Sequence, residues 1–376
     1  MEEKIHRKYS IEHLELGSPG TYVYKYRITD IQVQHWNELF DLSALQTLTF
    51  TALVLESGLD EFLSLSFPAL TSITFRCMDE PSACYFDKVK RFIRGLSRLE
   101  SLYILGWDWF VASLAGPDTR NGYGTPPDHP SRTLQTLWLE HRTDLPSFTS
   151  RWEKTRSYIL SASEITRLGA FYPLVKDLCI IIRRSKGDSD EVARYKALGA
   201  SFPHLKRLVL TLDASPPHIS LGNDGIFILQ PKSTQFEDQY SPVVLYTNGD
   251  CMYVMVNSAL DAKLARQIFA AIASQSLETM MVRVKGGMEF VVHPCIPLRL
   301  QPRSNTPGLA LRPWLNGLAR EWIVDTINSK GEVKVREIGR NAEGWKGEAR
   351  DPLKVHYMDP FMKHFRTLWP DSKMGG

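Results

Sequence analysis

The sequence predicts an α/β fold, an irregular leucine-rich-repeat solenoid shaped as a horseshoe with a C-terminal capping region. A short phrase, apolar-x-x-apolar-x-apolar, recurs along the 376 residues. An aromatic-Pro prefix precedes three of its copies at the same offset, and stretches with helical spacing lie between copies. A strand, a loop and a helix make one solenoid unit, and such units stack because none can bury its apolar face alone.

The phrase predicts a short strand, since its last three positions place two apolar side chains inward and one side chain outward. Its copies begin at Ile11, Leu45, Leu70, Leu99, Leu134, Val175, Leu205 and Leu277. Alone it is a weak signal, because on the order of ten matches arise by chance in a chain of this composition. The prefixes Phe67-Pro68, Tyr172-Pro173 and Phe202-Pro203 make it more specific, and a proline there stops a preceding helix before the strand.

Helices are expected between the strands. Apolar residues follow helical spacing over residues 85–96, 192–199 and 260–272, and residues 148–168 are also expected to be helical. Ser189 precedes the second of these stretches, and Ser258 with Asp261 resembles a capping box in front of the third. Asp188, Asp190 and Glu191 are expected to be solvated loop and helix-start charges.

The uneven distance between phrases predicts insertions. One domain is expected over residues 1–293, with insertions near 116–131, a Pro/Gly/Asn-rich loop, and near 213–257. The second insertion is expected to hold short strands at 225–229, 243–246 and 251–256, with an Asn248-Gly249 hairpin turn. Residues 294–376 are expected to form a cap of mixed α/β and loop structure, with a helix at 314–327 and a strand at 332–338.

Composition excludes several classes of function. The net charge of +3, from 45 basic and 42 acidic residues, argues against nucleic-acid and membrane-surface partners. Five cysteines without a CxxC pair indicate a reducing compartment, and the charged N-terminal stretch lacks the apolar core of a signal peptide. A cytoplasmic or nuclear location is therefore expected.

The motifs of common enzymes are not found. The sequence has no GxxxxGK[ST], GxSxG or HExxH pattern, and its histidines and cysteines lack the spacing of metal ligands. We therefore expect no catalytic residue, no cofactor and no metal, and a non-enzymatic function as a protein–protein interaction scaffold. The alternative is an enzyme or a small-molecule binder of unrecognised type that uses the concave face.

The phrases FPALTSITF, YPLVKDLCI and FPHLKRLVL, together with FRTLWP near the end, resemble the repeat region of filamentous-fungal F-box/leucine-rich-repeat proteins. The resemblance covers roughly residues 10–285. It implies the substrate-recognition part of a ubiquitin ligase receptor, with the adaptor of a cullin-RING ligase as one partner and an unknown client protein as the other. No F-box with an early Leu-Pro is recognisable in residues 1–44, so only the recognition half is expected here.

A binding site is expected on the face lined by the strands. Most outward positions of the phrases are small or polar, but Tyr103 and Trp138 on adjacent copies are large aromatics, which are favoured binding anchors. The predicted site consists of Tyr103, Trp138, Trp107, Trp109, Asp177 and Arg207, the last two giving polar selectivity. Alternatively, the aromatic side chains pack under the 116–131 loop or against the C-terminal region.

Overall fold

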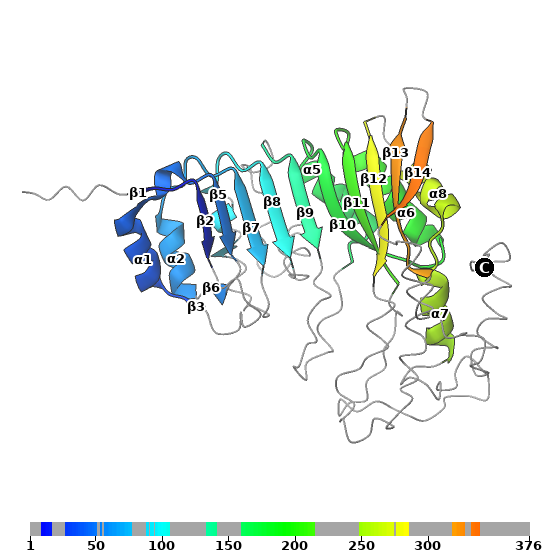
Figure 1. Ribbon diagram of the computed structural model, residues 1–376, viewed down its shortest axis with the longest axis horizontal. Helices are drawn as coiled ribbons and strands as arrows, with labels where there is room; N and C mark the ends of the chain where they lie inside the picture. Colours follow the sequence, from blue (N-terminus) through cyan, green and yellow to red (C-terminus); the bar gives the residue numbers. More distant parts are fainter. Residues whose placement is uncertain are drawn as a thin grey trace, which may run out of the picture.

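The structure is a computed structural model of the chain. It describes residues 9–16, 27–50, 53–54, 56–76, 88–89, 91–93, 95–105, 133–140, 159–214, 248–273, 276–285, 318–327 and 332–338. These residues form one long open sheet with helices beside it (Figure 1).

Ten strands of the described residues form this sheet, in the order β14-β13-β12-β11-β10-β9-β8-β7-β5-β2. In chain order they are β2 (His13–Leu16), β5 (Thr47–Phe50), β7 (Ser72–Arg76), β8 (Ser101–Leu105), β9 (Thr136–Glu140), β10 (Asp177–Arg183), β11 (Arg207–Asp213), β12 (Thr279–Lys285), β13 (Glu321–Thr326) and β14 (Val333–Ile338). Neighbours from β2 to β12 are parallel, whereas β13 runs antiparallel to both β12 and β14. Two short parallel pairs, β1 (Tyr9–Ser10) with β4 (Phe40–Asp41) and β3 (Arg27–Ile28) with β6 (Leu53–Val54), are separate from this sheet.

Each of the eight phrases contains a strand, as predicted, and each strand begins two residues after the phrase does. The common offset produces a common register: Thr47 pairs with both His13 and Ser72. In the same way Asp177 pairs with Thr136 and Arg207. Because side chains alternate along a strand, this register places the apolar positions of all phrases on one face of the sheet.

Helices cover that apolar face. They are α1 (Asp30–Leu39), α2 (Glu56–Ser64), α5 (Ala162–Phe171), α6 (Ser189–Ser201) and α8 (Ala262–Ile272), and the described residues between 88 and 95 are also helical. Helix α7 (Asn248–Ser258) lies beside the turn that follows β10 instead. In Figure 1, α5 and α6 lie behind the central strands. Leu168, Leu198 and Ile268 from α5, α6 and α8 join the fully buried strand residues Leu137 and Leu208 in one core.

None of the helices formed by the described residues is both long enough and apolar enough to cross a lipid bilayer.

Side-chain caps fix where four of the described helices begin, and at α1 the capping box is Thr29 with Gln32. Ser161 and Glu164 form a capping box at α5. Asp188 is the N-cap of α6, which confirms its predicted position at a helix start. The predicted capping box of Ser258 and Asp261 is wrong. Asp261 is itself the N-cap of α8 and accepts a hydrogen bond from the Leu264 amide at 2.7 Å, whereas Ser258 is the last residue of α7.

Two glycines let the helices approach each other closely. A Cβ on Gly169 of α5 would lie 2.4 Å from the Ser201 carbonyl oxygen, and a Cβ on Gly199 of α6 would lie 2.1 Å from the Ile272 carbonyl oxygen. Both distances are far below van der Waals contact with backbone atoms. The helix layer over β10–β12 therefore depends on glycine at these positions.

The predicted leucine-rich-repeat solenoid is wrong. The described residues form a single open ten-stranded sheet with helices, which is an α/β arrangement, and they give no positive sign of a solenoid of repeats. Strands β13 and β14 pair antiparallel and extend the sheet. The predicted horseshoe instead required a capping layer at this end of the chain. The phrase determines only the alternation within a strand, so it predicted the strands without determining how the segments between them are built. The boundary between residues 1–293 and 294–376 stays a prediction.

Two further local predictions are wrong. The helix expected at 314–327 contains strand β13, in which Trp322 and Val324 alternate inward onto the core. The strand expected at 251–256 and its Asn248-Gly249 turn lie in helix α7. Short apolar runs suit both a strand and a buried helix, and the packing around them decides. The strands expected at 225–229 and 243–246 and the 116–131 loop lie outside the described residues.

Candidate functional site

The sheet face opposite the helices carries the predicted binding residues. We call it the open face; the outward side chains of β8–β12 that define it include Tyr103, Trp138, Glu140, Asp177, Arg183, Arg207, Thr211, Asp213, Arg283 and Lys285. Tyr103, Trp138, Asp177 and Arg207 lie on the four consecutive strands β8, β9, β10 and β11. Trp107 and Trp109 lie outside the described residues.

Tyr103 and Trp138 are direct neighbours across β8 and β9. Their ring centroids are 6.2 Å apart with an angle of 32° between the ring planes, and both side chains are half-buried. This separation lies in the range at which aromatic rings attract each other. The register of the sheet therefore creates a partly exposed aromatic pair on the open face.

Asp177 and Arg207 also form a pair. Arg207 donates from Nη2 to Oδ2 of Asp177 at 2.7 Å and from Nε to Oδ1. The hydrogen bond and charge of Asp177 raise the pKa of the Arg207 guanidinium. The Arg207 side chain is 71% exposed, so the pair stabilises the fold little and its guanidinium is accessible.

Glu140 is the centre of a charged cluster that sequence reasoning missed. Its Oε1 accepts hydrogen bonds from Nη2 of Arg283 at 2.6 Å and from Nζ of Lys285 at 3.0 Å. Its Oε2 accepts one from the indole Nε1 of Trp138 at 3.0 Å. Since Glu140 is on β9 and both cations are on β12, these side chains bridge above β10 and β11.

The neighbours of Glu140 have opposing effects on its acidity. Burial raises the pKa of this carboxyl, but hydrogen bonds from Trp138 and Lys285 and the positive charges of Lys285 and Arg283 outweigh burial. The pKa of Glu140 is therefore lowered, and the side chain is ionised at neutral pH.

Cys179 lies beneath this bridge. The phrase pattern placed it in the outward column, yet it is fully buried. Burial, and then the negative charge of Glu140, raise the pKa of its thiol to about 12. A thiol that stays protonated is a poor nucleophile and a poor metal ligand, so Cys179 contributes packing rather than chemistry.

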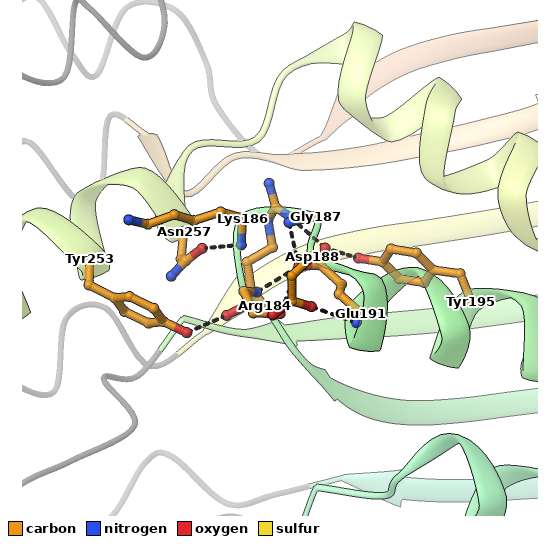
Figure 2. A network of polar contacts seen from close by, with 9 residues as sticks. Arg184, Lys186, Gly187, Asp188, Glu191, Tyr195, Tyr253 and Asn257 are labelled. Carbon is orange, nitrogen blue, oxygen red and sulfur yellow. Dashed lines mark hydrogen bonds and ion pairs between the residues drawn. The ribbon is translucent and has the colours of Figure 1, made fainter.

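A second polar cluster lies where β10 turns into α6 (Figure 2). Arg184 and Glu191 form an ion pair at 2.5 Å whose side chains are 2% and 1% exposed. Glu191 also accepts hydrogen bonds from the Tyr195 hydroxyl at 2.6 Å and from the backbone amides of Ser185 and Gly187 at 2.6 and 2.9 Å. Glu191 is thus buried and fully hydrogen-bonded, and the expectation that it is a solvated charge is wrong.

Helix α7 attaches to the same turn. The Tyr253 hydroxyl donates to the Arg184 carbonyl oxygen at 3.0 Å, and the Lys186 amide donates to Oδ1 of Asn257 at 2.8 Å. The Lys186 ammonium also lies 5.7 Å from the centroid of the Tyr253 ring. In Figure 2, Tyr253 and Asn257 both point from α7 toward the turn. This cluster fastens elements together and leaves no face of Glu191 for a substrate.

The described side chains of the open face include groups that can contact a ligand. This face presents aromatic rings, charge pairs and hydroxyl groups, but no nucleophile paired with a base among the described residues. The described part of the chain also contains no group of three or more His, Cys, Asp or Glu side chains that can hold a metal ion.

One signal in the sequence pointed to the missed cluster. Arg283 and Lys285 continue the outward alternation of Thr279 and Met281 past the end of the phrase, and Glu140 does the same after Trp138. Extending the Leu134 phrase by one residue and the Leu277 phrase by three would have placed all three on the open face.

The comparisons with known proteins leave the family open. No family model matches the sequence, and no curated protein matches it significantly.

Proposed function

We propose that the chain is a non-enzymatic scaffold that binds another protein with the open face of its sheet. The observation that carries the proposal is the half-buried Tyr103–Trp138 pair on adjacent strands. Large aromatic side chains with a polar group are the residues that most often dominate binding energy at protein interfaces. Surface side chains that only solvate a sheet are normally smaller or charged.

The surroundings of the pair support the same function. The accessible Arg207 guanidinium and the Glu140–Arg283–Lys285 cluster lie on the strands that follow, so polar groups border the aromatic centre on one side. This arrangement matches the apolar centre and polar rim of protein interfaces.

The dimensions favour an extended segment as the bound element. The five strands β8–β12 span about 19 Å at about 4.8 Å per strand. The aromatic pair and the charged groups beside it occupy only these five strands of the ten-stranded sheet, a width that is small for a domain-sized interface, which buries about 800 Å² on each partner. A peptide segment that crosses the strands fits it better.

A narrower proposal rests on the sequence resemblance alone. If the chain is the substrate-recognition part of an F-box-type ubiquitin ligase receptor, the bound protein is a ligase client and the cullin-RING adaptor is a second partner. Recovery of the cullin and its adaptor together with one enriched client is the result that supports it.

The test is affinity purification of the tagged protein from a native fungal extract, with mass spectrometry of the proteins that co-purify. The variant Tyr103→Ala with Trp138→Ala is expected to lose at least about tenfold of the specific partner, as removal of central aromatic anchors does. The matched control is Thr49→Ala with Thr74→Ala, on the same register row but on β5 and β7. Equal recovery by the aromatic variant and the control contradicts the proposal. A large fall in melting temperature of the aromatic variant indicates that the two rings serve packing instead.

A further inference from the structure

The Glu140 cluster contains more positive than negative charge. Two cations, Arg283 and Lys285, share one carboxylate, so the cluster carries a net charge of +1. The neighbouring charges balance: Asp177 pairs with Arg207, and the charges of Asp213 and Arg183, which are register partners on the same face, cancel. Asp213 is also the register partner of Lys285. The Glu140 cluster is therefore the place on the open face where an additional negative group gains most.

The two cations also have donors to spare. A guanidinium has five N–H groups and an ammonium has three. Arg283 uses Nη2 toward Glu140 and Nε toward Oγ1 of Thr211 at 3.1 Å, and Lys285 uses one donor toward Glu140. Their side chains are 16% and 25% exposed, so a ligand can reach them.

The indole of Trp138 joins the cluster to the aromatic pair. Its ring neighbours Tyr103, and its N–H donates to Glu140. A ligand that places an apolar side chain on the ring pair therefore has its adjacent residues beside Arg283 and Lys285. Charge complementarity at that point favours a carboxylate.

Resting on the proposed function, we infer that Arg283 and Lys285 form a carboxylate subsite, and that the bound segment of the partner carries Asp or Glu beside an aromatic or large apolar residue. Glu140 occupies part of this subsite in the free chain. An incoming carboxylate binds the unused donors of both cations and competes with Glu140 for the rest. A nucleic-acid ligand is disfavoured, because Glu140 and Asp177 place negative charge on the same face.

The experiment compares two short fluorescein-labelled peptides that differ only in a central Glu-Phe-Glu or Gln-Phe-Gln, with binding measured by fluorescence anisotropy. The acidic peptide is expected to bind about tenfold more tightly, the size of effect that a charge-assisted hydrogen bond provides. The difference is expected to shrink as salt is added.

Three variants assign the preference to the cluster. Arg283→Met with Lys285→Met is expected to remove the preference for the acidic peptide. Glu140→Gln is expected to strengthen binding of the acidic peptide severalfold, since it removes the internal competitor. Lys206→Met is the matched control, because Lys206, the residue before β11, is an exposed cation that is already paired with Glu278. Circular dichroism of each variant checks folding, and Lys285→Gln replaces the double variant if that one does not fold.

The outcomes separate this inference from the proposed function. If the two peptides bind equally, or the acidic one does not bind, or Glu140→Gln weakens its binding, the inference is overturned. If both peptides bind equally and Tyr103→Ala with Trp138→Ala abolishes that binding, the proposed function is supported but the carboxylate subsite is not. If the variant Tyr103→Ala with Trp138→Ala binds the peptides as tightly as the unmodified chain does, the proposed function itself is contradicted. A single-stranded oligonucleotide that binds more tightly than the acidic peptide also overturns the inference, in favour of a nucleic-acid ligand.

Discussion

Replacing Glu191 by glutamine removes one negative charge from the buried cluster at the start of α6 while keeping the shape of the side chain. Glu191 is fully buried and accepts hydrogen bonds from four donors within 3 Å: Nη1 of Arg184, the Tyr195 hydroxyl and the amides of Ser185 and Gly187. Glutamine offers one carbonyl oxygen, and its NH₂ group faces whichever donors the oxygen does not serve.

The magnitude follows from these contacts. Each buried donor left without an acceptor costs about 1–3 kcal/mol, and the guanidinium of Arg184, 2% exposed, loses its counter-charge. Removing one partner of a buried ion pair typically costs about 3–5 kcal/mol. We therefore expect Glu191→Gln to lower the free energy of unfolding by about 3–5 kcal/mol.

The assay is urea denaturation followed by circular dichroism. The control is Glu278→Gln, which neutralises one partner of an exposed pair with Lys206 and is expected to cost no more than about 1 kcal/mol. Adding Arg184→Met to Glu191→Gln removes the stranded charge and lets the amide donate to the Tyr195 hydroxyl, so most of the loss should be recovered. A Glu191→Gln variant as stable as Glu278→Gln would refute this reasoning.

Three further predictions concern packing and pH. Gly199→Ala should cost at least about 1–3 kcal/mol in the same assay, because its Cβ meets the Ile272 carbonyl oxygen, whereas Gly95→Ala, with open space around it, should cost nothing. The Cys179 thiol, with its raised pKa, should resist alkylation at pH 8 until the chain unfolds, and peptide mapping of the labelled protein will show this. Keeping this thiol protonated in the fold stabilises the folded state fully below pH 9, and that contribution should fall as the pH rises toward 12. Fast labelling of the native protein would contradict the resistance to alkylation. Because the pKa of Glu140 is lowered in the fold, its contribution to stability exists above about pH 4.5 and is lost in more acid solution. Glu140→Gln should therefore flatten the acid side of a plot of unfolding free energy against pH. An unchanged acid side would contradict a lowered pKa for Glu140.

Local patterns were sufficient for much of the secondary structure. Eight strands were predicted from the phrase, and β14, α6 and α8 were predicted from alternation, helical spacing and polar residues at the helix start. Asp188 could be assigned to a helix start because its side chain caps an amide three residues away. Such features depend on neighbours within one turn of the chain.

The segments misread in the sequence are those whose state depends on distant contacts. The short apolar run at 251–256 suited a strand, but Val254, Met255 and Val256 are three consecutive buried residues of helix α7. Trp322 suited a helix by composition, yet its indole donates to the Leu260 carbonyl oxygen from strand β13. Backbone pairing with β12 made residues 321–326 a strand, and α7 is held by the Tyr253 hydrogen bond to Arg184, 69 residues away in sequence.

The sequence by itself determined which residues of the phrases turn outward, and therefore that Tyr103 and Trp138 lie on one face. Their contact follows from the parallel register of β8 and β9, which the common offset of the phrases already implied. Only the tertiary structure decided that Glu140 meets Arg283, 143 residues later, above two intervening strands, and that Glu191 is buried against Arg184. The repeated phrase shows which side chains of each strand point to the core. Whether charged side chains from different strands come into contact depends on the order of the strands in the sheet and on the length of those side chains, and a local sequence pattern gives neither the order nor the contact.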